Sequence, residues 1–154
     1  MTEPEKIDTH GARCAVWLQG PPVDGRPAAT IGQFHCDDAR SGTRLLLETT
    51  EQLNAKGVRY VLGPMDGDTW HSYRLVTDRG SAPPFFLEPS NPPHYVEAFE
   101  AAGFAPVARY VSLIDRTLAQ NPAVQRRADV RVRTWRAGEA DEELRRLHEL
   151  SLKA

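Results

Sequence analysis

The order of hydrophobic and polar positions predicts a β-hairpin near the start of the chain. Two β-prone runs, ARCAVWLQG at 12–20 and AATIGQFHC at 28–36, flank a turn rich in proline and glycine, with Asp24 and Gly25 at its tip. Two such runs joined by a Gly-containing turn are typical of antiparallel strands. The segment 1–11 is polar, and we expect it to be a frayed lead-in.

A helical pattern follows the second run. Small and apolar residues recur at steps of three and four, which places them on one helix face. They are Ala39, Gly42, Leu45, Leu46, Thr49 and Leu53. Asp37 and Asp38 precede the pattern as potential N-cap residues, and Lys56-Gly57 ends it. The pattern therefore predicts an amphipathic helix of about 18 residues.

The next run, VRYVLG at 58–63, has the composition of a short buried strand. A strand, a helix and a strand in this order favour a parallel pair with a right-handed crossover. Ligands bind at the carboxyl ends of parallel strands, so the loop that begins the helix is a candidate binding site.

A second helix is predicted after Asn91, which can cap it, while the following prolines suit its first turn. Its apolar stripe consists of Tyr95, Ala98, Phe99 and Ala102. Gly103 permits the turn at its end, and the alternating run APVARYVSLI at 105–114 predicts a further strand.

These two segments resemble the acetyl-CoA-binding half of the GNAT N-acetyltransferase superfamily. The run Asp37-Asp38-Ala39-Arg40-Ser41-Gly42 matches the family's Gln/Arg-x-x-Gly-x-Gly/Ala turn, although only its second glycine is present. The later helix matches the family's Asn...Tyr-x-x-x-Gly-Phe ending, with Phe99 where many members have tyrosine. The resemblance implies an α/β fold with a mixed central sheet flanked by helices.

The resemblance also implies a cosubstrate site for acetyl-CoA or a related acyl-CoA. Its pyrophosphate would lie on the backbone around Arg40, Ser41, Gly42 and Thr43, at the positive end of the helix dipole. The implied activity is N-acyl transfer to a small amine. The alternative is a catalytically silent GNAT-like binding or regulatory module. For the residues at the start of this helix, the alternative to a pyrophosphate site is a capped helix whose small glycine packs on the sheet.

An aromatic insertion at 65–90 lies between the two family signatures. We expect a short helix from Asp68 or Thr69 to Arg74, a turn at 78–80, and an extended segment at 83–87 that packs across the sheet and covers the acceptor cleft. The acceptor would then meet aromatic and basic side chains of the insertion. The candidates are Trp70, Tyr73, Arg74, Phe85 and Phe86.

Amine acetylation needs a base for the ammonium proton and an acid for the thiolate. Glu88, flanked by apolar residues that could raise its pKa, is one candidate base, and His71 is another. Tyr95 could supply the acid. The alternatives remain an ion pair of Glu88 with Arg74 or Arg79, a surface or packing role for His71, and core packing for Tyr95.

The composition of the chain limits the kinds of partner that it is expected to bind. The chain has 154 residues, 40% of them hydrophobic and 26% charged, and a formal net charge of -2. This composition predicts a cytoplasmic globular protein that binds neither nucleic acid nor membranes. The five histidines are scattered, so we expect no metal site. Cys14 and Cys36 are expected to be reduced.

The tail has its own pattern. After a GNAT-like domain at 12–118, a linker is expected at 119–128 and a strand and helix at 129–154, with Asp141 as the helix cap. This unit would either begin a second, truncated GNAT-like domain or complete the first sheet. A homodimer or a second GNAT-like domain is the partner expected for it.

Overall fold

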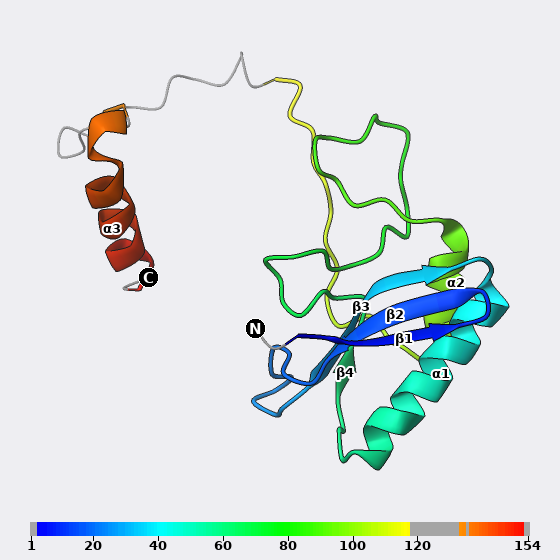
Figure 1. The fold of residues 1–154 in the computed structure, drawn as a ribbon. Coiled ribbons are helices and arrows are strands. Elements are labelled where there is room, and N and C mark those ends of the chain that lie inside the picture. Colours follow the sequence, from blue (N-terminus) through cyan, green and yellow to red (C-terminus); the bar gives the residue numbers. More distant parts are fainter. Residues whose placement is uncertain (1–2, 118–132, 135, 153–154) are drawn as a thin grey trace. The chain divides into compact units, whose positions relative to one another are not determined.

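The computed structural model describes residues 3–117, 133–134 and 136–152, which fall into two compact units, 1–109 and 110–154. The first unit contains a four-stranded sheet in the order β1-β2-β3-β4 (Figure 1). Its strands are β1 (Glu5–Thr9), β2 (Ala12–Trp17), β3 (Ala29–Cys36) and β4 (Val61–Leu62). Strands β1 and β3 are antiparallel to β2, and β4 is parallel to β3. The predicted α/β class with a mixed sheet is confirmed.

The expectation of a frayed lead-in at 1–11 is wrong, because Glu5–Thr9 form strand β1. All five of its residues pair with β2, from Glu5 opposite Val16 to Thr9 opposite Ala12. Gly11 has a φ of 81°, which glycine adopts without strain, and this permits the two-residue connection between the strands. Ile7 packs against the core and is the one apolar position that marks the strand in the sequence.

The predicted hairpin is present as β2 and β3, with an irregularity near its carboxyl end. Ala15 lies opposite Gly32, but Arg13 lies opposite His35, so β3 contains one extra residue between these pairs. Gln33, within this bulge, has a φ of 46°. A bulge leaves a backbone group out of the ladder and redirects nearby side chains.

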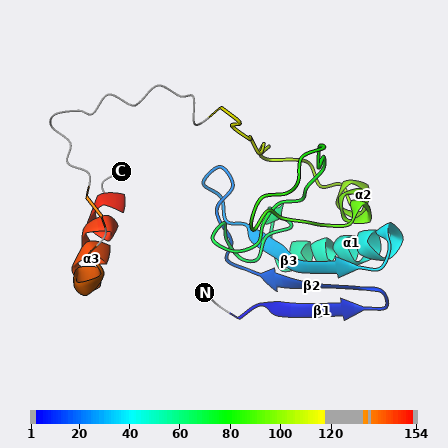
Figure 2. The ribbon, with the colours of Figure 1, turned by 90° about the horizontal axis from the view of Figure 1, so that it is seen from above.

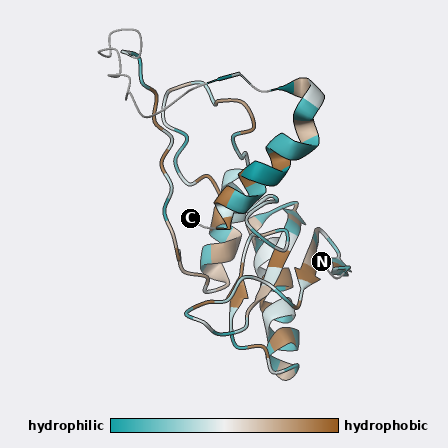
Figure 3. Cartoon of the chain, turned by 90° about the vertical axis from the view of Figure 1, so that its left-hand side faces the viewer, coloured by the Kyte–Doolittle hydropathy of each residue, from teal (hydrophilic) through white to brown (hydrophobic). Residues whose placement is uncertain are grey.

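Helix α1 (Ala39–Ala55) confirms the helical pattern, since Gly42, Leu45, Leu46, Thr49 and Leu53 are its buried residues. It packs against β2, β3 and α2 (Pro93–Ala101) (Figure 2). Figure 3 shows apolar positions interleaved with polar ones along the helices, and those of α1 belong to its buried face. The strands contribute Val16 and Ile31 to this core.

Two expectations around α2 are wrong. Pro92, not Asn91, is the N-cap residue, because the Asn91 side chain bonds the backbone of Val76 at both its N–H and its C=O, at 2.7 and 3.3 Å. Asn91 therefore fixes the end of the insertion. The run 105–114 forms no strand, and its apolar residues Val107 and Val111 are exposed. An alternating pattern forms a strand only where another strand lies beside it to accept its hydrogen bonds.

The insertion has no helix between residues 68 and 74. It forms a loop closed by an isolated bridge between Met65 and Tyr73 and by the Asp66 N–H, which donates to Ser72. The segment 83–87 does not pack across the sheet, since Phe86 and Leu87 are exposed. A turn at these residues, with Leu87 at a φ of 63°, points the apolar side chains away from the core.

The second unit contains helix α3 (Ala140–Ser151), which follows a 3-10 turn at Ala137–Glu139. The N-cap is Glu139, so Asp141 lies in the first turn of the helix and is not its cap. Most of the strand predicted at 129–135 and the linker at 119–128 lie outside the described residues. No helix in the described part of the chain is long and apolar enough to cross a membrane.

Candidate functional site

Two sets of polar contacts from separate parts of the first unit lie along the last residues of β3, one between Gln33 and Asp66 and the other between Tyr95 and His35. The bulge and the last residues of β3 contribute Gln33 and His35, and the insertion contributes Asp66. The first turn of α2 contributes Tyr95, and the residues that precede α1 contribute Asp37. We call this group the β3 carboxyl-end cluster.

Tyr95 and His35 form the centre of this cluster. The Tyr95 hydroxyl is 2.8 Å from His35 Nδ1, and the other ring nitrogen of His35 is 3.7 Å from an Asp37 carboxylate oxygen. Burial raises the pKa of Tyr95, so its hydroxyl stays protonated at neutral pH. A phenol, an imidazole and a carboxylate in this order can pass a proton between a bound molecule and solvent.

The β3 bulge adds a backbone donor to the cluster. The Gln33 N–H donates to Asp66 Oδ1 at 2.6 Å, so the donor released from the strand ladder is bound by a carboxylate. The Asp66 carboxylate lies close to the strand backbone. A Cβ built on the neighbouring Gly32 would lie only 2.3 Å from the same oxygen. This N–H can bind a negative oxygen of a ligand only after the Asp66 carboxylate has moved away from it.

The N–H groups expected to hold a pyrophosphate already have partners. The Ser41 N–H donates to Asp38 Oδ1 at 2.8 Å, and the Gly42 N–H donates to the Asp38 carbonyl at 3.1 Å. The bond from Ser41 lowers the pKa of Asp38, which is therefore anionic at neutral pH. The Thr43 hydroxyl donates to the Ala39 carbonyl, and Arg40 is exposed. The start of α1 is thus capped by its own carboxylate.

Gly42 has a packing role. A Cβ at this position would lie 2.8 Å from Cys36 Sγ, 2.9 Å from Ala98 Cβ and 3.1 Å from Phe34 Cζ. The absence of a side chain thus lets α1 approach both β3 and α2. The packing alternative that the sequence left open is correct for this glycine.

Phe99 and Tyr95, one helical turn apart, have different surroundings. Phe99 is only 3% exposed, and its ring lies edge-on to Phe34 and Phe104, with centroids at 4.9 and 5.0 Å. It is a core residue, in agreement with its place on the apolar stripe of the predicted helix. Tyr95 also touches Phe34, but its hydroxyl reaches His35. The hydroxyl group absent at Phe99 is therefore present one turn earlier, at the edge of the core.

The candidate bases of the insertion have local partners. His71 Nδ1 lies 2.7 Å from Asp68 Oδ1, and this bond lowers the pKa of Asp68. Glu88 is half-buried and accepts the Phe85 N–H at 3.3 Å. The neighbouring Phe86 is 87% exposed and does not enclose the Glu88 carboxylate.

The candidate substrate residues do not form one apolar wall. Trp70 is 93% exposed and Phe85 is 55% exposed. Tyr73 belongs to the bridge that closes the loop, and the Arg74 guanidinium lies over its ring, 5.3 Å from the centroid.

Both cysteines are free, as expected, and both are buried. Burial, with the nearby Asp38 and Asp37, raises the pKa of Cys36 to about 11, so its thiol is a poor nucleophile at neutral pH. Burial also raises the pKa of Cys14. Among the described residues, no group of three or more His, Cys, Asp and Glu side chains is placed to hold a metal ion.

Comparisons with models of protein families, with curated proteins and with solved structures give no match to this chain. The functional argument for this site therefore uses only its own geometry. Sequence reasoning missed His35, Asp37 and Gln33, and it assigned no role to Asp66. His35 was visible as a polar residue at the end of a strand, but its pairing with Tyr95 joins positions 60 residues apart.

Proposed function

We propose that this chain is an acyl-CoA-dependent N-acyltransferase of GNAT type that transfers an acetyl group to a small amine. The observation that carries the proposal is the β3 carboxyl-end cluster, which combines a backbone oxyanion donor with a paired phenol and imidazole. The chain that follows β4 brings Asp66 to this end of β3. The two strands pair at Ala29–Thr30 with Val61–Leu62, the Met65 N–H then donates to the Ile31 carbonyl, and the Gln33 N–H donates to Asp66.

Each group has a distinct role in this reaction. The amine nitrogen attacks the thioester carbon, and the Gln33 N–H stabilises the oxygen that becomes negative. The Asp66 carboxylate leaves that N–H for the acceptor ammonium and takes the proton that the nitrogen must lose before it attacks. The second proton of the nitrogen goes to solvent as the amide forms. Collapse of the intermediate breaks the carbon–sulfur bond, and Tyr95 gives its proton to the CoA thiolate. His35 then returns a proton to Tyr95 from solvent.

A catalytically silent GNAT-like binding module is the second candidate function. The observation that favours it is the Asp38 carboxylate on the Ser41 N–H, because an anion already occupies the end of α1 where a pyrophosphate would bind. A cosubstrate must displace this carboxylate or bind beside it. The module would pair with another domain or chain and need no cosubstrate.

Calorimetric titration with acetyl-CoA and CoA separates the two functions. The transferase should bind acetyl-CoA weakly, and Asp38→Ala should bind it more tightly, because the variant removes a negative charge and frees the Ser41 N–H. Arg40→Gln should weaken binding in both backgrounds. If neither the native chain nor Asp38→Ala binds either ligand, the transferase proposal fails and the binding module remains.

Turnover tests the role of Tyr95. With acetyl-CoA and simple primary amines, Tyr95→Phe should reduce thiol release about 100-fold, the usual contribution of one general acid. Acetyl-CoA affinity should stay unchanged, since only the hydroxyl is removed. The matched control is Tyr73→Phe, on the insertion. Equal rates for Tyr95→Phe and the native chain would show that solvent protonates the thiolate.

A further inference from the structure

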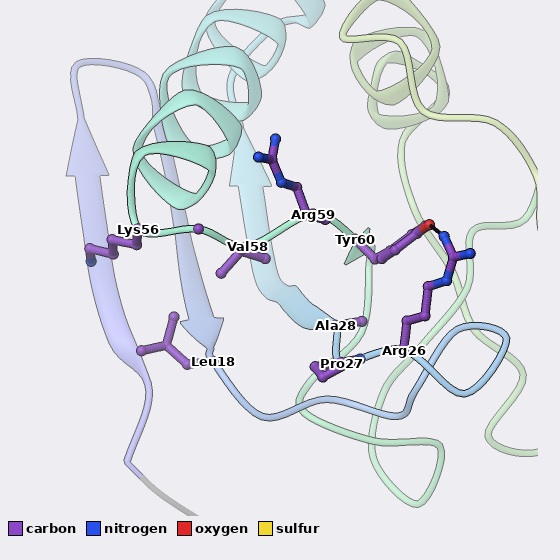
Figure 4. A pocket seen from close by; sticks show the side chains of 9 residues that line it. Leu18, Arg26, Pro27, Ala28, Lys56, Val58, Arg59 and Tyr60 are labelled. Atoms are coloured by element: carbon purple, nitrogen blue, oxygen red, sulfur yellow. Dashed lines mark hydrogen bonds between the residues drawn. The ribbon is translucent and has the colours of Figure 1, made fainter.

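A second candidate binding site lies at the opposite end of β3, where a surface hollow of about 710 Å³ opens between three connections. Leu18 follows β2, Pro27 and Ala28 precede β3, and Val58 belongs to the link between α1 and β4. Figure 4 shows that Leu18 and Val58 border the same space from opposite sides. Together these four side chains give the hollow an apolar floor.

The rim of the hollow is basic. It carries Arg26, Lys56 and Arg59, together with Tyr60, and none of the lining residues is acidic. This is unexpected in a chain with a formal net charge of -2. The hollow therefore concentrates positive charge around apolar surface.

The three cations differ in how they are balanced. Lys56 lies 2.8 Å from the Glu5 carboxylate, which neutralises it. The two arginines have neutral partners, since Arg26 bonds the Tyr60 hydroxyl and Arg59 donates to the Asn54 side-chain carbonyl at 3.3 Å. The Arg26 guanidinium also lies 5.6 Å from the centre of the Tyr60 ring. Two guanidinium groups on this rim thus keep an unbalanced charge.

The link that carries part of this rim is fixed by backbone hydrogen bonds. The Val58 N–H donates to the Leu53 carbonyl at 3.0 Å, and the Tyr60 carbonyl accepts the Ala29 N–H at 3.0 Å. Tyr60 and Val58 are therefore held at set positions before any ligand arrives. A preformed hollow loses less conformational entropy on binding than one that must assemble.

We propose that this hollow binds a small organic carboxylate with an apolar body, such as an aryl or short acyl carboxylate. The apolar body would lie on Leu18, Pro27 and Val58, the carboxylate would be held by Arg26, and Arg59 would add positive charge at the rim. Arginine binds a planar carboxylate through two parallel N–H bonds. The proposal is independent of the transferase reaction, because it uses residues at the other end of the strand.

Amide chemical-shift mapping of the full chain with 2-naphthoate as the probe tests this site. Shifts should concentrate on residues 26–28 and 57–60. Arg26→Gln and Arg59→Gln should each weaken binding by up to about 5-fold, the upper range for an exposed ion pair. Lys56→Gln should change affinity less, because Glu5 already balances this lysine.

Two controls make the result decisive. Arg109→Gln removes an exposed positive charge that does not line the hollow and should leave affinity unchanged. Uncharged 2-naphthalenemethanol should bind more weakly than 2-naphthoate. Equal binding of the two probes, shifts centred elsewhere, or no shifts at millimolar 2-naphthoate would each overturn the proposal.

Discussion

The two ends of β3 differ in how their polar groups are balanced. At the carboxyl end, Asp38, Asp66 and His35 each have a hydrogen-bonded partner within the protein. At the amino end, two arginines on the rim of an apolar hollow have neutral partners. The carboxyl end is thus an internally paired site that a ligand must rearrange, whereas the amino end presents charge that a ligand can meet directly.

The reason for this difference lies in the connections. The carboxyl end is surrounded by the starts of α1 and α2 and by the insertion, so side chains from separate segments reach one another. The amino end is bordered by the turn at 18–28 and by the short link at 56–60, which is tied down mainly through its backbone. Its charged side chains, Arg26, Lys56 and Arg59, are exposed. Substitutions at each end should therefore have different consequences.

The largest effect on stability is expected beneath the carboxyl end. Gly42→Val should reduce the free energy of unfolding by about 1–3 kcal/mol, the usual range for overpacking. The new side chain would meet Ala98 Cβ and Cys36 Sγ at less than van der Waals distance, at 2.9 and 2.8 Å for the Cβ alone. Urea unfolding followed by circular dichroism measures this change.

Gly138→Val is the matched control for that substitution. A Cβ at Gly138 would have no atom within 4 Å, so stability should change by about 0.5 kcal/mol or less. Equal stability of Gly42→Val and the native chain would contradict the close approach of α1 to α2. It would also make the start of α1 free to accept a larger group.

A smaller effect is expected at the α1 cap, and its sign depends on pH. The pKa of Asp38 in the folded protein is lowered below its ordinary value of 3.8 by the bond from Ser41. The stabilisation from this carboxylate is therefore complete above the unfolded pKa and is lost as pH falls through the folded pKa. Asp38→Ala should be less stable than the native chain at pH 7, and this difference should shrink below about pH 4.

Unfolding curves at pH 7 and pH 3 test the cap. Asp37→Ala is the comparison, because Asp37 is not the N-cap residue of α1. A stability difference for Asp38→Ala that is the same at both pH values would show that the ionised carboxylate does not stabilise the helix. In that case the start of α1 would offer less resistance to an incoming phosphate.

The smallest effect is expected at the amino end. Lys56→Gln breaks the ion pair with Glu5, whose side chains are 47% and 49% exposed, so stability should fall by about 0.5 kcal/mol or less. High salt should remove even this difference. Unfolding at low and high salt measures it. A loss above about 1 kcal/mol would mean that this pair holds β1 to the end of α1 more firmly than its exposure suggests.

The sequence by itself determined the elements whose patterns are local. The steps of three and four from Ala39 to Leu53 placed α1 and its buried face, and the paired β-prone runs placed β2 and β3. The order of strand, helix and strand gave the parallel pair. Each of these follows from side-chain period and chain length, which neighbouring residues carry.

Tertiary structure decided which of these patterns found partners. Residues 105–114 alternate as well as a strand does, yet they form none, whereas the polar Glu5–Thr9 segment is a strand because β2 accepts it along its whole length. The pairing of Tyr95 with His35, the bond from Gln33 to Asp66 and the packing of Gly42 against Ala98 join segments far apart in the chain. Periodicity describes one segment at a time, so it could not specify contacts that exist only after the segments pack together.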